Sequence, residues 1–154
     1  MKEIERKFLV QKERFTPSVF QTILKEAYLS VDPERVVRVR LEGEQAWITI
    51  KGKIMGITRS EFEYPISAGD AEEMLKLALF PPVEKIRHRI TWEGTLWEVD
   101  EFRGANEGLW LAEVELESED APFSRPGWLG EEVTHDRRYY NSQLAQRPYT
   151  TWEQ

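Results

Sequence analysis

The sequence predicts an α+β fold built on an eight-stranded antiparallel β-barrel that is closed, has a charged hydrophilic interior and carries a few helices on its outside. Three observations predict it. Ionisable residues alternate with apolar residues in many segments, the links between these segments are short, and the apolar positions form a second face. Short links join antiparallel neighbours, and closure into a barrel removes exposed strand edges.

Eight segments have the period of two that is typical of β-strands. Turn-forming residues separate them, as in Glu42-Gly43-Glu44 and Glu93-Gly94. The predicted strands are residues 2–11, 22–31, 35–43, 45–52, 57–66, 83–93, 95–103 and 108–118.

Helical periodicity is limited to short pieces. Residues 70–79 place apolar residues on one stripe, Ser67 and Asp70 have the spacing of a capping signal, and Pro81 and Pro82 stop the helix. A second helix is expected from Asn141 to just before Pro148, and a short helical turn within residues 12–21, after Thr16-Pro17. We expect these pieces to cover apolar outer faces of the strands. The expected covered residues are Ile48, Ile50, Phe62, Ile86, Ile90, Val114 and Leu116.

Ionisable residues of like sign recur two positions apart on the predicted strands. A charged alternation on one strand usually marks a wet face of an antiparallel sheet. Side chains two apart lie roughly 7 Å from each other, and like charges at that distance repel by roughly 0.6 kcal/mol in water and about 2.4 kcal/mol at an effective dielectric of 20. The like pairs are Glu3 with Glu5, Arg38 with Arg40, Glu61 with Glu63, Lys85 with Arg87, and Glu113 with Glu115. Such a set indicates the lining of a cavity that binds a cation and an anion together.

The composition indicates a globular chain that works in a reducing compartment. The chain has 154 residues, of which 40% are hydrophobic and 32% are charged, a size that fits one domain over residues 1–154. Cysteine is absent, and so are a leader-like segment and an apolar run that could span a membrane. We therefore expect a cytoplasmic protein without a membrane partner, with residues 148–154 as a loose tail.

The charge of the chain excludes some partners and permits others. The net charge is −7 and the pI is about 5.0, whereas proteins that bind duplex nucleic acid usually carry a basic face. A small phosphate compound held by a local basic cluster remains possible. His88 has the parity that points away from the charged rows, so carboxylate-bound Mg²⁺ or Mn²⁺ is favoured over zinc.

Several segments together resemble a known family. Glu3-Ile4-Glu5-Arg6-Lys7 is similar to the ExExK signature of the CYTH superfamily, the triphosphate tunnel metalloenzymes. Further matches follow in family order over residues 1–146, and the chain most resembles the small bacterial inorganic triphosphatase group. They are Thr49-Ile50-Lys51-Gly52, Arg59-Ser60-Glu61-Phe62-Glu63-Tyr64, Val83-Glu84-Lys85-Ile86-Arg87, Glu113-Val114-Glu115-Leu116, Trp128-Leu129-Gly130 and Glu132-Val133-Thr134.

The resemblance implies an eight-stranded tunnel that binds a small-molecule triphosphate with Mg²⁺ or Mn²⁺, and a C-terminal helix that plugs one end. Carried over by residue, it implies three sets. The implied metal-binding set is Glu3, Glu5, Asp100, Glu113 and Glu115. The implied phosphate-binding set is Lys7, Arg38, Arg40, Lys51, Arg59, Lys85 and Arg87. The implied catalytic set is Glu61, Glu63 and Lys85.

The predicted reaction is hydrolysis of inorganic tripolyphosphate to pyrophosphate and phosphate by a monomer or homodimer. Glu61 or Glu63 is expected to orient the attacking water, although a role in charge balance alone stays open for both. Arg38 and Arg40 could form salt bridges to acidic strands when no ligand is bound. Competing hypotheses on the same scaffold are an adenylate cyclase, a thiamine, nucleoside or RNA triphosphatase, and a phosphate-binding protein without enzymatic activity.

A few charged and aromatic residues are placed outside the site. Glu98, Arg89 and Glu117 share the parity of lining residues but lie near strand ends, so they are predicted to face solvent. Trp47 is predicted to belong to the outer core. Tyr28 is expected to meet the plugging helix, and Arg137 and Arg138, which precede that helix, are candidates to reach the tunnel.

Overall fold

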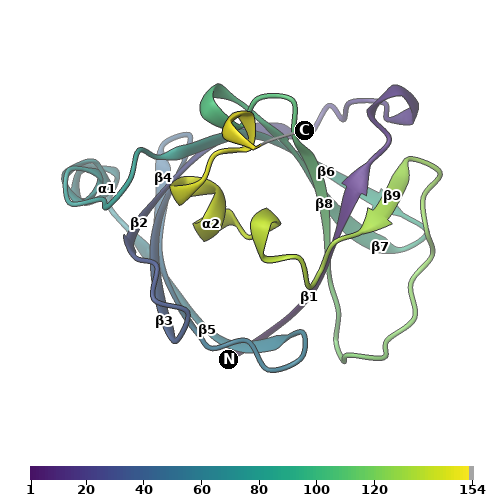
Figure 1. Cartoon of the computed structure of the whole chain (residues 1–154), viewed down its shortest axis with the longest axis horizontal. Coiled ribbons are helices and arrows are strands. Elements are labelled where there is room, and N and C mark those ends of the chain that lie inside the picture. Colours follow the sequence, from purple (N-terminus) through teal and green to yellow (C-terminus); the bar gives the residue numbers. More distant parts are fainter. Residues whose placement is uncertain (153–154) are drawn as a thin grey trace.

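A computed structural model, which describes residues 1–152, forms a closed antiparallel barrel with short helices at its ends and sides (Figure 1). The strands are β1 (Lys2–Val10), β2 (Gln21–Ser30), β3 (Arg35–Glu42), β4 (Gln45–Gly52), β5 (Thr58–Ile66), β6 (Val83–Trp92), β7 (Thr95–Phe102), β8 (Trp110–Glu115) and β9 (Leu129–Glu132). The α-helices are α1 (Ala68–Leu75) and α2 (Asn141–Gln146), and 3-10 turns occupy Lys12–Arg14, Gly104–Asn106, Arg137–Tyr139 and Tyr149–Thr151.

The first eight strands close the barrel, as the sequence predicts. Their order around the barrel is β5-β4-β3-β2-β6-β7-β8-β1, and β1 returns to β5 through pairs such as Glu3 with Arg59. The later part of β1 pairs instead with β8, where Glu5 lies opposite Glu115. Strand β9, which the strand periodicity did not predict, pairs with the end of β1 and so extends the edge that β5 leaves open.

The strand register brings inward residues of neighbouring strands level with one another. Arg38 on β3 lies opposite Tyr28 on β2 and Thr49 on β4, and Thr49 lies opposite Glu63 on β5. On the other side Arg87 lies opposite Asp100. Because side chains alternate between faces, one register match fixes a whole row. The charged rows predicted from the sequence therefore meet inside the barrel.

Most apolar packing lies outside the barrel wall, as predicted, but different segments cover it. One cluster holds Phe8, Trp97 and Trp128, and Phe123 of the irregular segment 116–128 packs against it. A second, smaller cluster packs Val39 and Ala46 under Ala71 of α1. The helices were expected to cover the outer wall more fully. The outer residues Ile50 and Phe62 on β4 and β5 stay 40% and 43% exposed, so that expectation is wrong for this face.

Helix α1 is shorter than predicted at its C-terminal end. Its N-cap is Ser67, whose hydroxyl accepts a hydrogen bond from the Asp70 amide, as the capping signal indicated. After Leu75 the chain continues in tight turns in which each amide bonds three residues back, so the helical stripe ends. Leu79, predicted on the buried stripe, is 55% exposed. Within residues 12–21 only the turn Lys12–Arg14 is helical, and it lies before Thr16-Pro17, so the expected position after them is wrong.

The C-terminal segment closes one end of the barrel from within (Figure 1). Leu144 of α2 is fully buried in an apolar cluster with Tyr28 and Val36, which lie on strands of the barrel. The chain after α2 is held too, because the Tyr149 amide donates to Asn106 Oδ1 at 2.8 Å and the Thr150 hydroxyl donates to the Ala105 carbonyl. The expectation of a loose tail is therefore wrong for residues 148–152, and the rest of that tail lies outside the described residues.

Strand β9 approaches β1 closely because a glycine lies at the contact. A Cβ on Gly130 would lie 2.9 Å from the Leu9 carbonyl oxygen. On the outer face the Arg6 guanidinium binds both carboxylate oxygens of Glu132, which ties the two strands together. Within residues 1–152, the helices are too short and too polar to cross a membrane.

Gly130→Ala is expected to destabilise the protein by about 1–3 kcal/mol, because the added methyl meets backbone that cannot move without breaking the β1–β9 pairing. Gly127→Ala is the matched control, since its Cβ would meet nothing within 4 Å. The free energy of unfolding in urea would be measured for both. Equal values for the two variants would contradict the assignment of Gly130 as a close-contact position.

Candidate active site

The barrel encloses two cavities that share part of their lining. The plug-side cavity lies next to α2 and encloses about 90 Å³, and the mouth cavity lies toward the other end and encloses about 540 Å³. Six residues line both, so the cavities form one charged tunnel. These shared residues are Glu3, Glu5, Arg38, Lys51, Arg87 and Glu113.

The structure brings nearly all the predicted site residues to this tunnel. Lys7, Arg59 and Lys85 line the plug-side cavity, together with Tyr28, Thr134, Tyr140 and Asn141. Arg40, Glu61, Glu63 and Glu115 line the mouth cavity. Arg89, Glu98 and Glu117 line the mouth as well, so the prediction that they face away from the tunnel is wrong: the barrel is deep enough to include these strand ends. Among the predicted residues, Asp100 lines neither cavity.

Asp100 lies on the inner face of β7, beneath the side chains of Arg87 and Lys85, as a fully buried counter-ion. Both of its oxygens accept hydrogen bonds from the Arg87 guanidinium, at 2.8 and 2.9 Å, and Lys85 Nζ lies 3.0 Å from Oδ2. These two cations occupy both carboxylate oxygens. The geometry therefore suits Asp100 to holding Arg87 and Lys85 in place better than to the metal ligation that the family resemblance implies.

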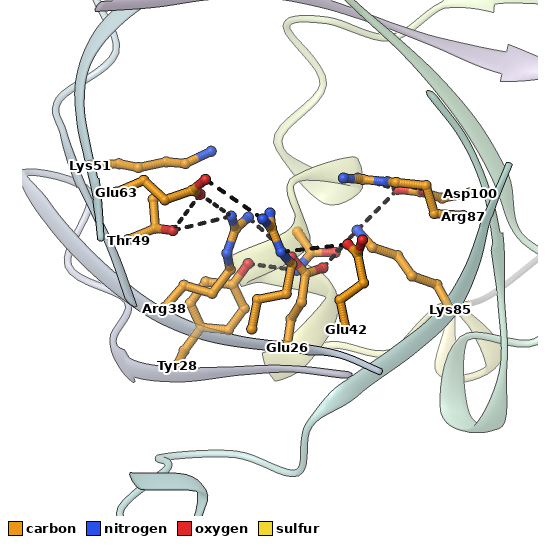
Figure 2. Close-up of polar contacts among 12 residues, drawn as sticks. Glu26, Tyr28, Arg38, Glu42, Thr49, Lys51, Glu63, Lys85, Arg87 and Asp100 are labelled. Carbon is orange, nitrogen blue, oxygen red and sulfur yellow. Dashed lines mark hydrogen bonds and ion pairs between the residues drawn. The ribbon is translucent and has the colours of Figure 1, made fainter. Parts of the chain in front are cut away.

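Glu26 on β2 is a second buried counter-ion of Lys85, and the sequence analysis missed it. Its side chain is fully buried, 2.7 Å from Lys85 Nζ and 3.2 Å from an Arg38 nitrogen (Figure 2). Burial opposes ionisation, but Lys85 and Arg38 outweigh it and hold the pKa of Glu26 far below its ordinary value. The signal was available, because Glu26 shares the parity of Tyr28 on the same predicted strand.

Lys85 is held by both counter-ions. Burial disfavours its charged form, but Asp100 and Glu26 raise its pKa above the ordinary value, so the amine is protonated. The ammonium also donates a hydrogen bond to Asn141 Oδ1 of α2, at 3.2 Å. A fixed ammonium beside the plug-side cavity is suited to binding a phosphate oxygen.

Arg38 and Arg40 form the salt bridges that the sequence analysis left open. Glu63 lies 3.7 Å from Arg38 and 3.6 Å from Arg40, and it also accepts a hydrogen bond from the Thr49 hydroxyl at 2.8 Å (Figure 2). The Nε atoms of both arginines are buried without a hydrogen-bond partner among residues 1–152. Buried donors of this kind are normally satisfied, so these two fit a ligand or water in the tunnel.

Trp47 faces into the barrel, which corrects its assignment to the outer core. It has the parity of Thr49 and Lys51, and its register partner is Arg40, whose guanidinium lies 4.7 Å from the centre of the Trp47 ring. The assignment to the outer core placed Trp47 on the wrong face of its strand. Stacking against the ring fixes the plane of the guanidinium.

Glu3 is the most heavily paired of the predicted metal-binding carboxylates. Lys51 Nζ lies 3.1 Å from it and Arg59 Nε lies 3.3 Å from it. Burial raises its pKa, but Lys51 and Arg59, with a hydrogen bond from Glu61, lower it to about 2. The pKa of Glu61 moves in the opposite direction, to about 7, because of burial and the neighbouring Glu3.

Glu5 and Glu113 form a second pair of neighbouring carboxyl groups in the tunnel. Glu5 is partly buried, and among residues 1–152 it has no ion pair within 4 Å. Burial and the charges of Glu113 and Glu3 raise its pKa well above the ordinary value. Glu113, which lies 3.7 Å from Lys7, has its pKa lowered by Lys7 and Arg87 against the effect of burial. The pKa of the exposed Glu115 is raised by burial and by Glu3.

This carboxylate group fits a hard cation only in part. Within residues 1–152, no three carboxylates or imidazoles converge closely enough to form a preformed metal site. The donors are all oxygens, and Glu5 is a partly buried carboxyl group without a cation partner within 4 Å among residues 1–152, which suits Mg²⁺ or Mn²⁺. Mg²⁺ commonly takes only one or two carboxylates and completes its shell with water and phosphate oxygens. Glu5 and Glu113 are the residues best placed to hold it.

The remaining sequence predictions fall outside the tunnel. His88 points away from the lining, as predicted, and lies against Phe15 and Trp110. Arg137 and Arg138 line neither tunnel cavity. They line a separate cavity with Arg147 and Trp152 on the outer side of α2, so the idea that they reach the tunnel is wrong. Sequence reasoning had no signal for the contact of Asn141 with Lys85, because these residues are 56 positions apart.

Comparison with known proteins identifies the family. The CYTH domain profile matches residues 1–149. An inorganic triphosphatase from Acetivibrio thermocellus is 43% identical over 154 residues, which covers 99% of each chain. An inorganic triphosphatase from Nitrosomonas europaea is 38% identical and covers 94% of this chain and 97% of its own. A crystal structure of an inorganic triphosphatase is similar with a TM-score of 0.66 at 37% identity, covering 92% of this chain and 96% of the other. The chain belongs to the CYTH domain family.

Glu26→Gln is expected to destabilise the protein by about 3–5 kcal/mol, because it leaves Lys85 and Arg38 as buried cations with less compensation. Glu84→Gln is the matched control. It removes an exposed ion pair with Lys25, at 3.6 Å, and is expected to change stability by about 0–1 kcal/mol. Urea unfolding without phosphate would compare them. A small and equal loss in both variants would contradict the role given to Glu26.

Proposed function

We propose that this protein is a metal-dependent triphosphatase that hydrolyses inorganic tripolyphosphate to pyrophosphate and phosphate inside the tunnel. The observation that carries the proposal is the closed barrel, in which basic residues and Glu5 line one continuous cavity. Glu5 is a partly buried carboxyl group that has no ion pair within 4 Å among residues 1–152. Membership of the CYTH family and nearly full-length similarity to two inorganic triphosphatases support it.

The basic residues bind the substrate. Arg38 and Arg87 line both cavities and present planar donors that match phosphate oxygens, while Lys51 and Lys85 supply compact charges. Lys7 and Arg59 extend the set toward the plug, and Arg40 extends it toward the mouth. In the free protein these cations are balanced by carboxylates. A bound phosphate chain would replace those carboxylates as the partner of the cations.

Hydrolysis needs a water in line with the bond that breaks. The water oxygen bonds to the terminal phosphorus, the bridging P–O bond breaks, and pyrophosphate leaves. Glu63 is engaged by Thr49, Arg38 and Arg40, whereas within residues 1–152 Glu61 forms an ion pair with Lys51 alone, at 3.3 Å. Glu61 is therefore the better placed of the two predicted catalytic carboxylates to orient the water and accept its proton.

A divalent metal held by Glu5 and Glu113 would polarise phosphate oxygens and offset their charge. The carboxylates at the mouth, among them Glu98, Glu115 and Glu117, support the use of a metal-bound substrate, because they repel a free polyanion. We propose Mg²⁺ or Mn²⁺ as the metal, a monomer or homodimer as the active form, and a cytoplasmic location.

A cyclase or an organic triphosphatase on this scaffold would need a pocket for an organic group. The mouth cavity is lined almost entirely by ionic residues and the plug-side cavity is half ionic, which favours an inorganic substrate. Phosphate release from tripolyphosphate, ATP and thiamine triphosphate would be compared with Mg²⁺, Mn²⁺ or chelator. A strong preference for tripolyphosphate is expected. Cyclic AMP formed from ATP, or binding without turnover in the presence of metal, would refute the proposal.

Glu5→Gln is expected to lower metal-dependent turnover at least 100-fold, because the amide cannot ionise to the carboxylate that would bind the metal, while the fold is kept. Glu13→Gln, an exposed residue of the turn Lys12–Arg14, is the control and should retain full activity. Initial rates would be measured against metal concentration, with circular dichroism to verify folding. Full activity of a folded Glu5→Gln protein would refute the metal assignment.

A further inference from the structure

The plugging helix contacts the active site through one side chain. Asn141 is the first residue of α2, and its amide oxygen accepts a hydrogen bond from Lys85 Nζ at 3.2 Å. Its amide nitrogen donates to the Tyr28 hydroxyl at 2.6 Å. The amide therefore bridges Tyr28 on β2 and Lys85 on β6, and all three residues line the plug-side cavity.

The other contacts of Lys85 pull it in another direction. Glu26 on β2 and Asp100 on β7 lie 2.7 and 3.0 Å from Nζ, are fully buried and line neither cavity. Attraction to these two carboxylates draws the ammonium toward the barrel wall. Asn141 lies instead on the segment that enters the barrel end (Figure 1), so its hydrogen bond draws the ammonium toward the cavity.

The orientation of the Asn141 amide is itself determined. An ammonium only donates hydrogen bonds, so it requires the amide oxygen on its side. The amide nitrogen then faces the Tyr28 hydroxyl, which can accept. Tyr28 is 3% exposed and packs in the same apolar cluster as Leu144 of α2. Buried packing therefore holds in place both Tyr28 and the helix that carries Asn141.

We propose that Asn141 is a positioning residue that holds the Lys85 ammonium toward the plug-side cavity, where it meets a phosphate oxygen, against the pull of Glu26 and Asp100. The proposal rests on the function proposed above for the tunnel. It makes α2 part of the phosphate-binding machinery as well as a closure of the barrel. Without the amide, Lys85 remains protonated and buried but turns toward the wall.

The test is a double-mutant cycle between Asn141→Ala and Lys85→Ala, with kcat/KM for tripolyphosphate and Mg²⁺ as the readout. Asn141→Ala is expected to lower kcat/KM about tenfold, the effect of losing about one charge-assisted hydrogen bond. In the Lys85→Ala background, assayed at raised enzyme concentration, the same change should alter kcat/KM less than about twofold, because the group that Asn141 positions is gone.

Gln143→Ala is the matched control on the same helix, since Gln143 lines the separate outer cavity, and it should retain wild-type kcat/KM. Thermal unfolding of each variant separates loss of folded protein from loss of positioning. Wild-type kcat/KM in Asn141→Ala would overturn the inference, and so would an equal loss in both backgrounds, which is the result expected of a purely structural role.

The outcome also distinguishes this inference from the proposed function. If the wild-type protein does not turn over tripolyphosphate, the proposed function fails, and the same cycle is then measured on the calorimetric Kd for tripolyphosphate with Mg²⁺. Asn141→Ala should weaken that binding about tenfold in the wild-type background only. Equal affinity of the wild-type and Asn141→Ala proteins for tripolyphosphate, or no binding by either, would overturn the inference.

Discussion

Charge neutralisation inside a closed space is the constraint on which the rest of this structure depends. The barrel gathers like charges that would be harmless on an open surface, and burial removes the water that would screen them. Each buried ion is therefore shared. Glu26 contacts both Lys85 and Arg38, Asp100 contacts Lys85 and Arg87, and the links run across neighbouring strands. Loss of one ion affects several strands, since breaking a buried pair is strongly destabilising.

The ionic interior also determines where apolar packing lies. Because the inner faces of the strands are mainly polar, the outer faces must supply the core, and the cover comes from α1, from the segment 116–128 and from the contact of β9 with β1. The plugged end is the exception. There Val36 and Leu144 pack within the barrel end, which anchors α2. A helix of six residues has little stability of its own, so α2 depends on this packing.

The tunnel has a different chemical character at its two ends. The plug end holds Lys85 in a network of three acceptors, with Asn141 as the neutral one, whereas the mouth carries several carboxylates. Between them lies Glu5, a partly buried carboxyl group that has no ion partner within 4 Å among residues 1–152. A linear polyanion that carries a cation complements both ends, and the relatives named inorganic triphosphatase are proteins named for a linear polyanion.

Alternation by itself determined the strands, the closed barrel and the inward rows, because a period of two assigns every side chain on a strand to a face. It also carried the signal for Glu26, which was present and overlooked, and for Trp47, whose parity was misjudged. Tertiary structure alone decided which ions pair, that Asp100 lies beneath Arg87 and Lys85, and that Asn141 reaches Lys85. These contacts join residues far apart in the chain, and their geometry depends on strand register and on how the plug packs, neither of which a local pattern encodes.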